Sequence, residues 1–354
     1  MADQSAVKAA IEGAIAATIA QTSSTVAPTG DHGNELVDAA GQAVSGGKRM
    51  RAAALVTSYF AHGGTDLAAV APVAAGVELF QAAALVHDDL LDDAHTRRGR
   101  PTTHLAFAAS HRNRSDAGDP DRFGVAGAVL AGDLALVTAT RAVASAPLGP
   151  AAPVTLRLFT EMAELVTAGQ YLDMRIAAAP LSALPGQEQH IRATMRSKTA
   201  SYTAEFPLAL GAAAARGDGP HIEAAREAGV PAGIAFQLRD DLLGIVGEPQ
   251  VTGKPVGGDI REGKRTIPLW HAWTHTNAEG RAVLEAAVGN AEATEALVRE
   301  AIAVIQEAGA IAAVEEEIAA LSTRAASLVA ELDLPQDARS SLVELLSAWG
   351  VRDY

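Results

Sequence analysis

The sequence predicts an all-α fold, and three features of its 354 residues support that prediction. Hydrophobic residues make up 49% of the chain, which is enough for a large core. Alanine is abundant, aromatic residues are only 4%, and runs of β-branched residues are few, a composition that favours helix over sheet. Apolar residues also recur at intervals of three and four positions along almost the whole chain.

The same periodicity places the individual helices, and segments rich in Gly, Pro, Asp and Ser separate them. Helices 67–93 and 221–245 are apolar on most faces, which is typical of central helices in a large bundle. No break resembles a long linker, so we expect one all-α domain spanning 1–354. The predicted helices are 5–20, 35–44, 49–60, 67–93, 102–111, 124–144, 151–177, 188–212, 221–245, 266–275, 279–289, 292–308, 310–331 and 336–349.

Charge and cysteine content exclude several classes of function. The net charge of −14 argues against nucleic acid as the main partner, but it is compatible with a small phosphorylated ligand held by a local basic cluster. The absence of cysteine excludes disulfides, thiolate zinc sites and thiol nucleophiles. The N-terminus does not read as a signal peptide, and no uninterrupted apolar stretch is long enough for a membrane span. We expect a cytoplasmic protein.

Residues 87–102, HDDLLDDAHTRRGRPT, contain the first acidic motif. Asp88 and Asp92 are four apart, so in a helix they lie on one face, and Asp89 and Asp93 form a second such pair. Like charges at this spacing repel one another unless a cation binds between them. Carboxylate oxygens one helical turn apart suit Mg²⁺, which keeps several waters and bridges to substrate phosphates.

The alternative for this motif is a solvated acidic helix end. The neighbouring sequence disfavours it, because the acids directly follow the apolar stretch FQAAALV. Arg97 and Arg98 come soon after them, and arginine side chains match the geometry of phosphate oxygens.

A second acidic motif lies within the apolar stretch 232–246, AGIAFQLRDDLLGIV. A buried and unpaired Asp240–Asp241 pair would cost several kcal/mol, so it requires a metal, a cation or a water-filled cavity. Two Asp-rich helices of one bundle can face each other across such a cavity.

Basic residues occur in four further stretches that are locally Gly-rich or apolar. Each alone is compatible with solvated surface charge, and the glycines before Lys48 do not have the spacing of a Walker loop. Together with two acidic motifs they indicate one chemistry, in which metal ions bridge a diphosphate and basic side chains neutralise its remaining oxygens. The stretches are SGGKRMR (45–51), RSKTASY (196–202), VTGKP (251–255) and REGKRT (261–266).

In their order and spacing these motifs resemble those of the trans-isoprenyl diphosphate synthases, the polyprenyl synthetase family. The resemblance runs from about residue 35 to the C-terminus, and the N-terminal helix and loop at 1–34 match less well. It implies a single all-α domain of the isoprenoid synthase type around a central active-site cavity, and a homodimer. The matching motifs are GGKRMR, HDDLLD with RRGRPT, GD at 132–133, GQYLD, KTA, FQLRDD, TGKP and GKRT.

The resemblance also implies a role for each matching residue. The implied ligands of three Mg²⁺ ions are Asp88, Asp92 and Asp240, supported by Asp89, Asp241, Gln170 and Asp173. The implied contacts to the allylic diphosphate are Arg97, Lys198, Lys254 and Lys264. Those to isopentenyl diphosphate are Lys48, Arg51, Gln81 and Arg98, where many relatives have His at the Gln81 position. The implied catalytic residues are Lys198, Thr199 and Gln237, of which Thr199 and Gln237 match the polar groups near the carbon that becomes cationic.

The implied reaction is a Mg²⁺-dependent head-to-tail condensation of isopentenyl diphosphate with an allylic diphosphate. Metal ions and basic side chains stabilise the departing pyrophosphate. The double bond of isopentenyl diphosphate then attacks the allylic cation, and an apolar cavity keeps water away from it.

The chain departs from the family pattern at Gly244, where the second motif reads DDLLG instead of DDxxD. We expect activity to persist with altered metal affinity. Gly244 is also the one hint of an alternative, a non-catalytic subunit of a heteromeric prenyltransferase. A terpene cyclase is a further alternative, but it would not need the second diphosphate pocket of Lys48, Arg51 and Arg98.

Product length is expected to depend on the helix that precedes Asp88. Ala84 and Ala83 lie four and five positions before it and are small, while Phe80 lies one turn deeper on the same face. With Phe80 as the floor, the product is longer than farnesyl diphosphate, with geranylgeranyl diphosphate first and twenty-five carbons or more as the alternative. Ordinary core packing of Phe80 is the other interpretation.

Overall fold

A computed structural model describes residues 3–217, 219–247 and 257–350, and nearly all of them are helical. The strands in these described ranges are β1 (Thr96–Arg97) and β2 (Arg100–Pro101), which form a short antiparallel hairpin. The all-α prediction is therefore confirmed. The chain divides into two compact units, the first comprising Met1–Thr160 and Pro207–Ile222 and the second Glu161–Phe206 and Glu223–Tyr354.

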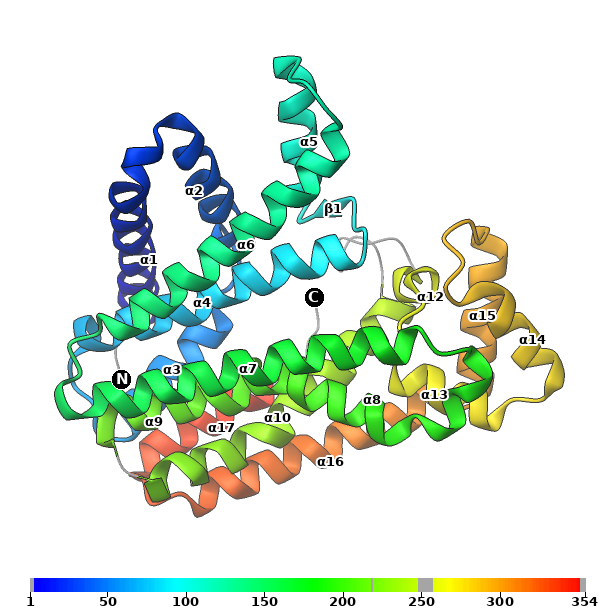
Figure 1. Cartoon of the computed structure of the whole chain (residues 1–354). Coiled ribbons are helices and arrows are strands. Elements are labelled where there is room, and N and C mark those ends of the chain that lie inside the picture. The colour runs from blue at the N-terminus through cyan, green and yellow to red at the C-terminus, as the bar shows by residue number, and fades with distance from the viewer. Residues whose placement is uncertain (1–2, 218, 248–256, 351–354) are drawn as a thin grey trace. The chain divides into compact units, whose positions relative to one another are not determined.

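The first unit is organised around α4 (Leu67–Leu91), which contacts α1, α2, α3 and α6 (Figure 1). The Asp66 carboxylate begins this helix by accepting hydrogen bonds from the N–H groups of Ala68 and Ala69. Most α4 residues between Ala69 and Ala83 are buried, as expected for a helix that is apolar on most faces. The other elements are α1 (Gln4–Val26), η1 (Ala27–Thr29), α2 (Asp31–Val44), α3 (Met50–Ala61), α5 (Thr103–Arg114), α6 (Pro120–Ala144), η2 (Gly149–Ala151), the start of α7 (Ala152–Ala177) and most of α9 (Phe206–Arg216).

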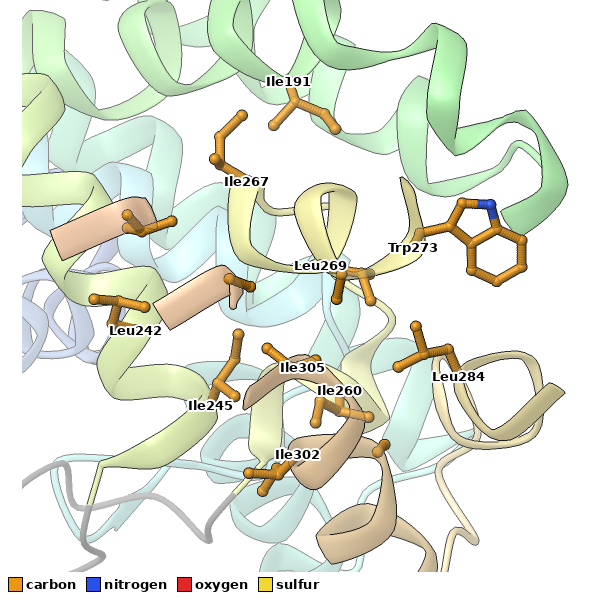
Figure 2. Close-up of a cluster of buried hydrophobic side chains, with 14 of the residues drawn as sticks. Ile191, Leu242, Ile245, Ile260, Ile267, Leu269, Trp273, Leu284, Ile302 and Ile305 are labelled. Atoms are coloured by element: carbon orange, nitrogen blue, oxygen red, sulfur yellow. The ribbon is translucent and has the colours of Figure 1, made fainter. Parts of the chain in front are cut away.

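The second unit contains the rest of α7, most of α10 (Gly219–Val246) and the C-terminal helices. Figure 2 shows part of its buried core, in which Leu242 and Ile245 of α10, Ile260 of α12 and Ile302 of α15 belong to one cluster. This packing holds the short helix α12 beside the end of α10. The remaining elements are η3 (Leu181–Gly186), α8 (Glu188–Thr194), η4 (Met195–Glu205), α12 (Gly258–Glu262), α13 (Ile267–His275), α14 (Ala278–Ala287), α15 (Glu295–Glu307), α16 (Ala310–Glu331) and α17 (Gln336–Gly350).

Several predicted boundaries differ from the observed ones. The single helix predicted over 188–212 consists of α8, the π-helical stretch η4 and α9. The helix predicted to begin at 124 begins at Pro120, because Asp119 caps it by accepting a hydrogen bond from the Asp121 N–H at 2.9 Å. The predicted break at 247–265 contains α12 in its described part.

Within the part of the chain that the structure describes, two helices, α4 and α6, are long and apolar enough to cross a membrane when length and hydropathy alone are considered. In α4, 78% of the relevant window is buried inside the protein, and in α6 44% is buried. Core helices often have this composition, so it is weak evidence against the expectation that the chain has no membrane span.

Candidate active site

The first acidic motif lies at the C-terminal end of α4. Asp88 and Asp89 belong to its last turn, and Asp92 follows the helix directly, with its N–H donating to the Asp88 carbonyl at 2.9 Å. This bond preserves the one-turn spacing of Asp88 and Asp92. Asp89 is buried, whereas the Asp93 side chain is 91% exposed, with its Oδ1 3.9 Å from Nε2 of His104.

Two adjacent arginines leave the following hairpin toward different partners. Arg97 of β1 donates from Nε to Oδ1 of Asp89 at 2.7 Å, and its Nη2 lies 3.9 Å from Oδ2 of Asp88. Arg98 has a positive φ of 53° at the hairpin turn and donates from Nη1 to the Ser45 carbonyl at 2.9 Å. One arginine therefore contacts the acidic motif, and the other contacts the Gly-rich loop between α2 and α3.

That loop is sharply turned because Gly46 and Gly47 have φ angles of 75° and 92°, which glycine adopts at little cost. A β-carbon on Gly47 would lie only 3.2 Å from Nη2 of Arg98, so glycine also leaves room for this guanidinium. Lys48 is exposed and Arg51 is buried in the first turn of α3. One part of the first unit thus contains the Gly-rich loop with Lys48, Arg51 and Arg98. Gln81 is half-buried on α4.

A partly buried ion-pair network that was not predicted from the sequence supports this loop. Arg49 binds Glu12 of α1 at 2.8 Å and Glu78 of α4 at 3.3 Å. Glu78 also accepts a hydrogen bond from the N–H of Ala52 at 3.1 Å, which fixes the first turn of α3 and with it Arg51. The sequence feature that could have indicated this network is Glu78, a glutamate in the apolar stretch of α4, three positions before Gln81.

The electrostatics of the loop favour an anion. The pKa of Arg98 is lowered by partial burial and then by the positive charges of Arg49, Arg97 and Arg51, against which Glu78 acts in the opposite direction. An anionic ligand would relieve this mutual repulsion. Residues of the acidic motif and of the Gly-rich loop border a cavity of about 1000 Å³ in the first unit. Its lining includes Asp89, Arg97, Arg98, Ser45, Gln42 and Leu85.

The second acidic motif lies on α10, where Asp241 is buried and Asp240 is half-buried. Gln237, one turn earlier, donates from Nε2 to Oδ1 of Asp241 at 2.6 Å. Burial raises the pKa of Asp241 well above its usual value, and the negative charges of Asp259 and Asp240 add to the effect, while the Gln237 hydrogen bond and Lys264 oppose it. A buried carboxylate among like charges is an environment that favours a bound cation.

Lys198 lies in the π-helical stretch η4, a geometry that is frequent at functional sites. Two glycines allow flanking helices to approach this stretch closely. A β-carbon on Gly169 of α7 would lie 2.5 Å from the backbone nitrogen of Lys198, and one on Gly233 of α10 would lie 2.7 Å from Cα of Ala200. The ammonium group of Lys198 lies 2.7 Å from Oδ2 of Asp173 on α7. The GQYLD and KTA motifs therefore meet in the second unit.

The other predicted residues of the second unit are placed as follows. Thr199 and Gln170 are half-buried, next to Lys198 and Gly169 respectively. Lys264 follows α12, and its ammonium group lies 2.8 Å from Glu262 and 3.6 Å from Asp259. Lys254, with the TGKP motif, lies outside the described residues.

The residues expected to set product length lie on α4. Phe80 is 4% exposed and packs edge to face against Phe159, with ring centroids 6.0 Å apart. Ala83 belongs to a small buried cluster with Ala40 and Ala135, and Ala84 is half-buried. Both interpretations of Phe80, tunnel floor and core packing, remain compatible with this arrangement.

The carboxylates of the two acidic motifs fit Mg²⁺. Within the described ranges, no three His, Asp or Glu side chains converge into a metal centre built by protein alone. Mg²⁺ does not require one, because it is usually held by one or two carboxylates together with waters and substrate phosphates. The carboxylates of Asp88 and Asp92, one turn apart, and those of half-buried Asp240 and buried Asp241 are hard oxygen donors of this kind.

Comparison with known proteins identifies the family. A sequence model described as polyprenyl synthetase matches residues 34–305. The chain is 34% identical over 268 residues to geranylgeranyl diphosphate synthase of Mycobacterium tuberculosis, covering 75% of this chain and 69% of that protein. It is 31% identical over 308 residues to geranylfarnesyl diphosphate synthase of Aeropyrum pernix, covering 85% and 89% of the two chains.

Solved structures agree with this assignment. The crystal structure of geranylgeranyl pyrophosphate synthase from Corynebacterium glutamicum, in complex with isoprenyl diphosphate and magnesium, is 33% identical. It superposes with a TM-score of 0.91, covering 99% of this chain and 100% of that one. With both acidic motifs and the basic residues placed as described, this chain belongs to the polyprenyl synthetase family.

Proposed function

We propose that this Mg²⁺-dependent prenyltransferase makes geranylgeranyl diphosphate by condensing isopentenyl diphosphate with an allylic diphosphate. The observation that carries the proposal is the divergence of Arg97 and Arg98. Arg97 contacts the acidic motif, whereas Arg98 contacts the Gly-rich loop that precedes Arg51. Two separate phosphate-binding arginines suit two diphosphate substrates, while a terpene cyclase acts on one.

We assign the allylic diphosphate to Arg97, Lys198, Lys254 and Lys264, and isopentenyl diphosphate to Lys48, Arg51, Gln81 and Arg98. Three Mg²⁺ ions are assigned to Asp88, Asp92 and Asp240, with Asp89, Asp241, Gln170 and Asp173 in support. When bound, these ions supply positive charge to the departing pyrophosphate.

The chain's own residues act on the substrates in three ways. Arginine and lysine side chains hold the diphosphates by charge-assisted hydrogen bonds, which orient the two reacting carbons. The polar groups of Thr199 and Gln237 lie near the developing allylic cation. The apolar surroundings exclude water, so that the double bond of isopentenyl diphosphate is the nucleophile, and the released pyrophosphate takes the proton.

We assign geranylgeranyl diphosphate as the product because Ala83 and Ala84 are small and Phe80 is the proposed floor of the product cavity. Synthases of geranylgeranyl and geranylfarnesyl diphosphate both occur among the relatives, so a product of twenty-five carbons or more is the alternative.

A homodimer is supported by exposed apolar side chains on α6, which include Val125, Val129, Leu130 and Val137. We further propose that the chain is one polyprenyl synthetase domain, because the family match at 34–305 includes segments of both compact units. A cytoplasmic location stays a prediction.

The decisive experiment incubates the purified protein with Mg²⁺, isopentenyl diphosphate and, in turn, each allylic primer of five, ten and fifteen carbons. A linear C20 diphosphate as the main product supports the proposal. Longer linear chains would replace the assigned product, cyclic hydrocarbons would indicate a cyclase, and no turnover would indicate a non-catalytic subunit.

A further inference from the structure

The last turn of α4 is an unfavourable place for a group of carboxylates. Four of them lie in this turn or directly after it, and no basic residue occupies the turn. Like charges one turn apart repel one another, and the negative end of the helix dipole adds to the repulsion. The turn that carries the first acidic motif therefore needs contacts from outside the helix to hold its shape. Arg97 supplies one such contact, through Asp89.

His87, the residue before the motif, supplies a second contact, to α6, which lies beside α4 in the first unit (Figure 1). Its Nε2 lies 3.3 Å from the Val129 carbonyl oxygen and 3.5 Å from Oδ1 of Asp133. Both neighbours are acceptors, so the ring proton is assigned to Nε2, which donates. This contact ties the end of α4 to α6 at the residue that immediately precedes Asp88.

Gly132 of α6 makes room for the His87 ring. A β-carbon on Gly132 would lie 2.5 Å from Cδ2 of His87 and nearer still to its Nε2, whereas real β-carbons essentially never have neighbours closer than 3.0 Å. Gly132 and Asp133 form the GD motif, the one motif of the family resemblance to which the proposed function gives no role. The structure gives both residues one task, since the first provides the space and the second a partner for the same imidazole ring.

The contact between His87 and α6 is too exposed to matter much for overall stability. The side chains of His87 and Asp133 are 34% and 59% exposed, and charged pairs in such places contribute little. Its place in the fold, in contrast, is the turn that carries Asp88 and precedes Asp92. We therefore expect loss of His87 to affect the acidic motif more than the folding of the chain.

We propose that His87 is a positioning residue for the first acidic motif, held by a hydrogen bond to α6 and accommodated by Gly132. It acts through Asp88 and Asp92, whose carboxylates it keeps in place before Mg²⁺ binds. The inference rests on the proposed function, because it concerns the Mg²⁺ ions of that reaction. It adds a residue that is not itself a ligand but orders the turn on which the ligands lie.

Hydrogen exchange measured by mass spectrometry tests this anchor without metal or substrate. In His87→Ala, the amides of residues 88–95 should exchange about 3–10-fold faster, the factor that corresponds to one ordinary hydrogen bond. Mg²⁺ binding, measured by isothermal titration calorimetry with inorganic pyrophosphate, should weaken by a similar factor, because the ligands must be ordered when the metal binds. The melting temperature should change by less than about 3 °C, since the contact is exposed.

Two conservative variants separate the hydrogen bond from the bulk of the ring. His87→Gln places an amide N–H where Nε2 lies, and it should bring exchange and Mg²⁺ affinity to within about twofold of the unmodified protein. His87→Asn places its amide nearer the backbone, where Nδ1 lies, and should behave like His87→Ala. The matched control is His95→Ala, which removes an exposed histidine on the other side of the motif and should leave both measurements unchanged.

Gly132→Ala tests the space for the ring. The added β-carbon displaces the imidazole, so this variant should match His87→Ala in exchange and in Mg²⁺ affinity. In the double variant His87→Ala with Gly132→Ala the ring is absent, so the second substitution should add nothing to the first.

The proposal is overturned if His87→Ala exchanges and binds Mg²⁺ like His95→Ala, or if the effects of His87→Ala and Gly132→Ala add in the double variant. Equal losses of Mg²⁺ affinity in His87→Gln and His87→Asn would also overturn it, by making His87 a packing residue. Circular dichroism establishes that each variant folds, and if His87→Ala does not, the comparison of His87→Gln with His87→Asn decides. The proposed function fails separately, if the unmodified protein elongates no primer, a result that leaves the hydrogen-exchange comparison standing.

Discussion

The two acidic motifs differ in how far along the chain the residues that contact them lie. At the end of α4, Asp88 and Asp89 lie against Arg97, nine and eight residues later in the sequence, because a short hairpin turns the chain back. On α10, Asp241 is bonded to Gln237 inside the helix, but the carboxylate beside Gly244 comes from α12, a separate element. A motif at a helix end can be completed by the turn that follows it. A motif within the body of a helix depends on what packs against it.

The largest expected effect is loss of activity on removing a carboxylate of the first motif. Asp88→Asn should lower kcat/KM for chain elongation by about 10²–10³-fold, a loss comparable to that of one strong electrostatic contact to the transition state. Asp93→Asn is the matched control, since that side chain is 91% exposed, and it should retain activity. Steady-state kinetics of both variants measure the difference, and equal losses would contradict the assignment of roles within this motif.

Phe80 tests whether the helix that carries the first motif also sets product length. Phe80→Ala removes a buried ring that packs on Phe159, which should cost about 3–5 kcal/mol of unfolding free energy. If Phe80 is the floor of the product cavity, the same variant makes longer products. Chain lengths are read by chromatography of the dephosphorylated products, and Phe159→Leu serves as a control for loosened packing. An unchanged product distribution from folded Phe80→Ala would leave Phe80 as core packing.

The adjacent arginines provide a sharper test of the first motif, because they should affect different substrates. Arg97→Lys should raise KM for the allylic diphosphate, and Arg98→Lys should raise KM for isopentenyl diphosphate. Each increase is expected at about 10–100-fold, equivalent to the roughly 1.5–3 kcal/mol of a hydrogen bond to a charged group. Varying one substrate at saturating levels of the other separates the two. Identical effects on both substrates would refute two distinct diphosphate sites.

The pairing of Asp88 with Asp92 could be predicted from residue spacing, whereas separate roles for Arg97 and Arg98 were implied only by the family resemblance. Helical periodicity alone predicts that Asp88 and Asp92 share a face. Composition and apolar spacing likewise predicted the all-α fold. Periodicity could not reveal η4, since apolar spacing of three to four residues does not distinguish a π-helical stretch from an α-helix. Nor could it reveal Asp259 beside Gly244 or Glu78 beside Arg49, which are contacts created by packing between separate helices.

The smallest expected effects concern the close helix approaches of the second unit. Gly169→Ala would bring a β-carbon to 2.5 Å from the Lys198 nitrogen, and Gly233→Ala would bring one to 2.7 Å from Cα of Ala200. Each should destabilise the protein by about 1–3 kcal/mol through overpacking. Gly13→Ala on α1 is the control, because a β-carbon there meets nothing within 4 Å and a mid-helix alanine should stabilise by about 0.5–1 kcal/mol. Chemical denaturation measures these differences. If all three variants were equally stable, the close approach of α7 and α10 to the Lys198 segment would not constrain these glycines.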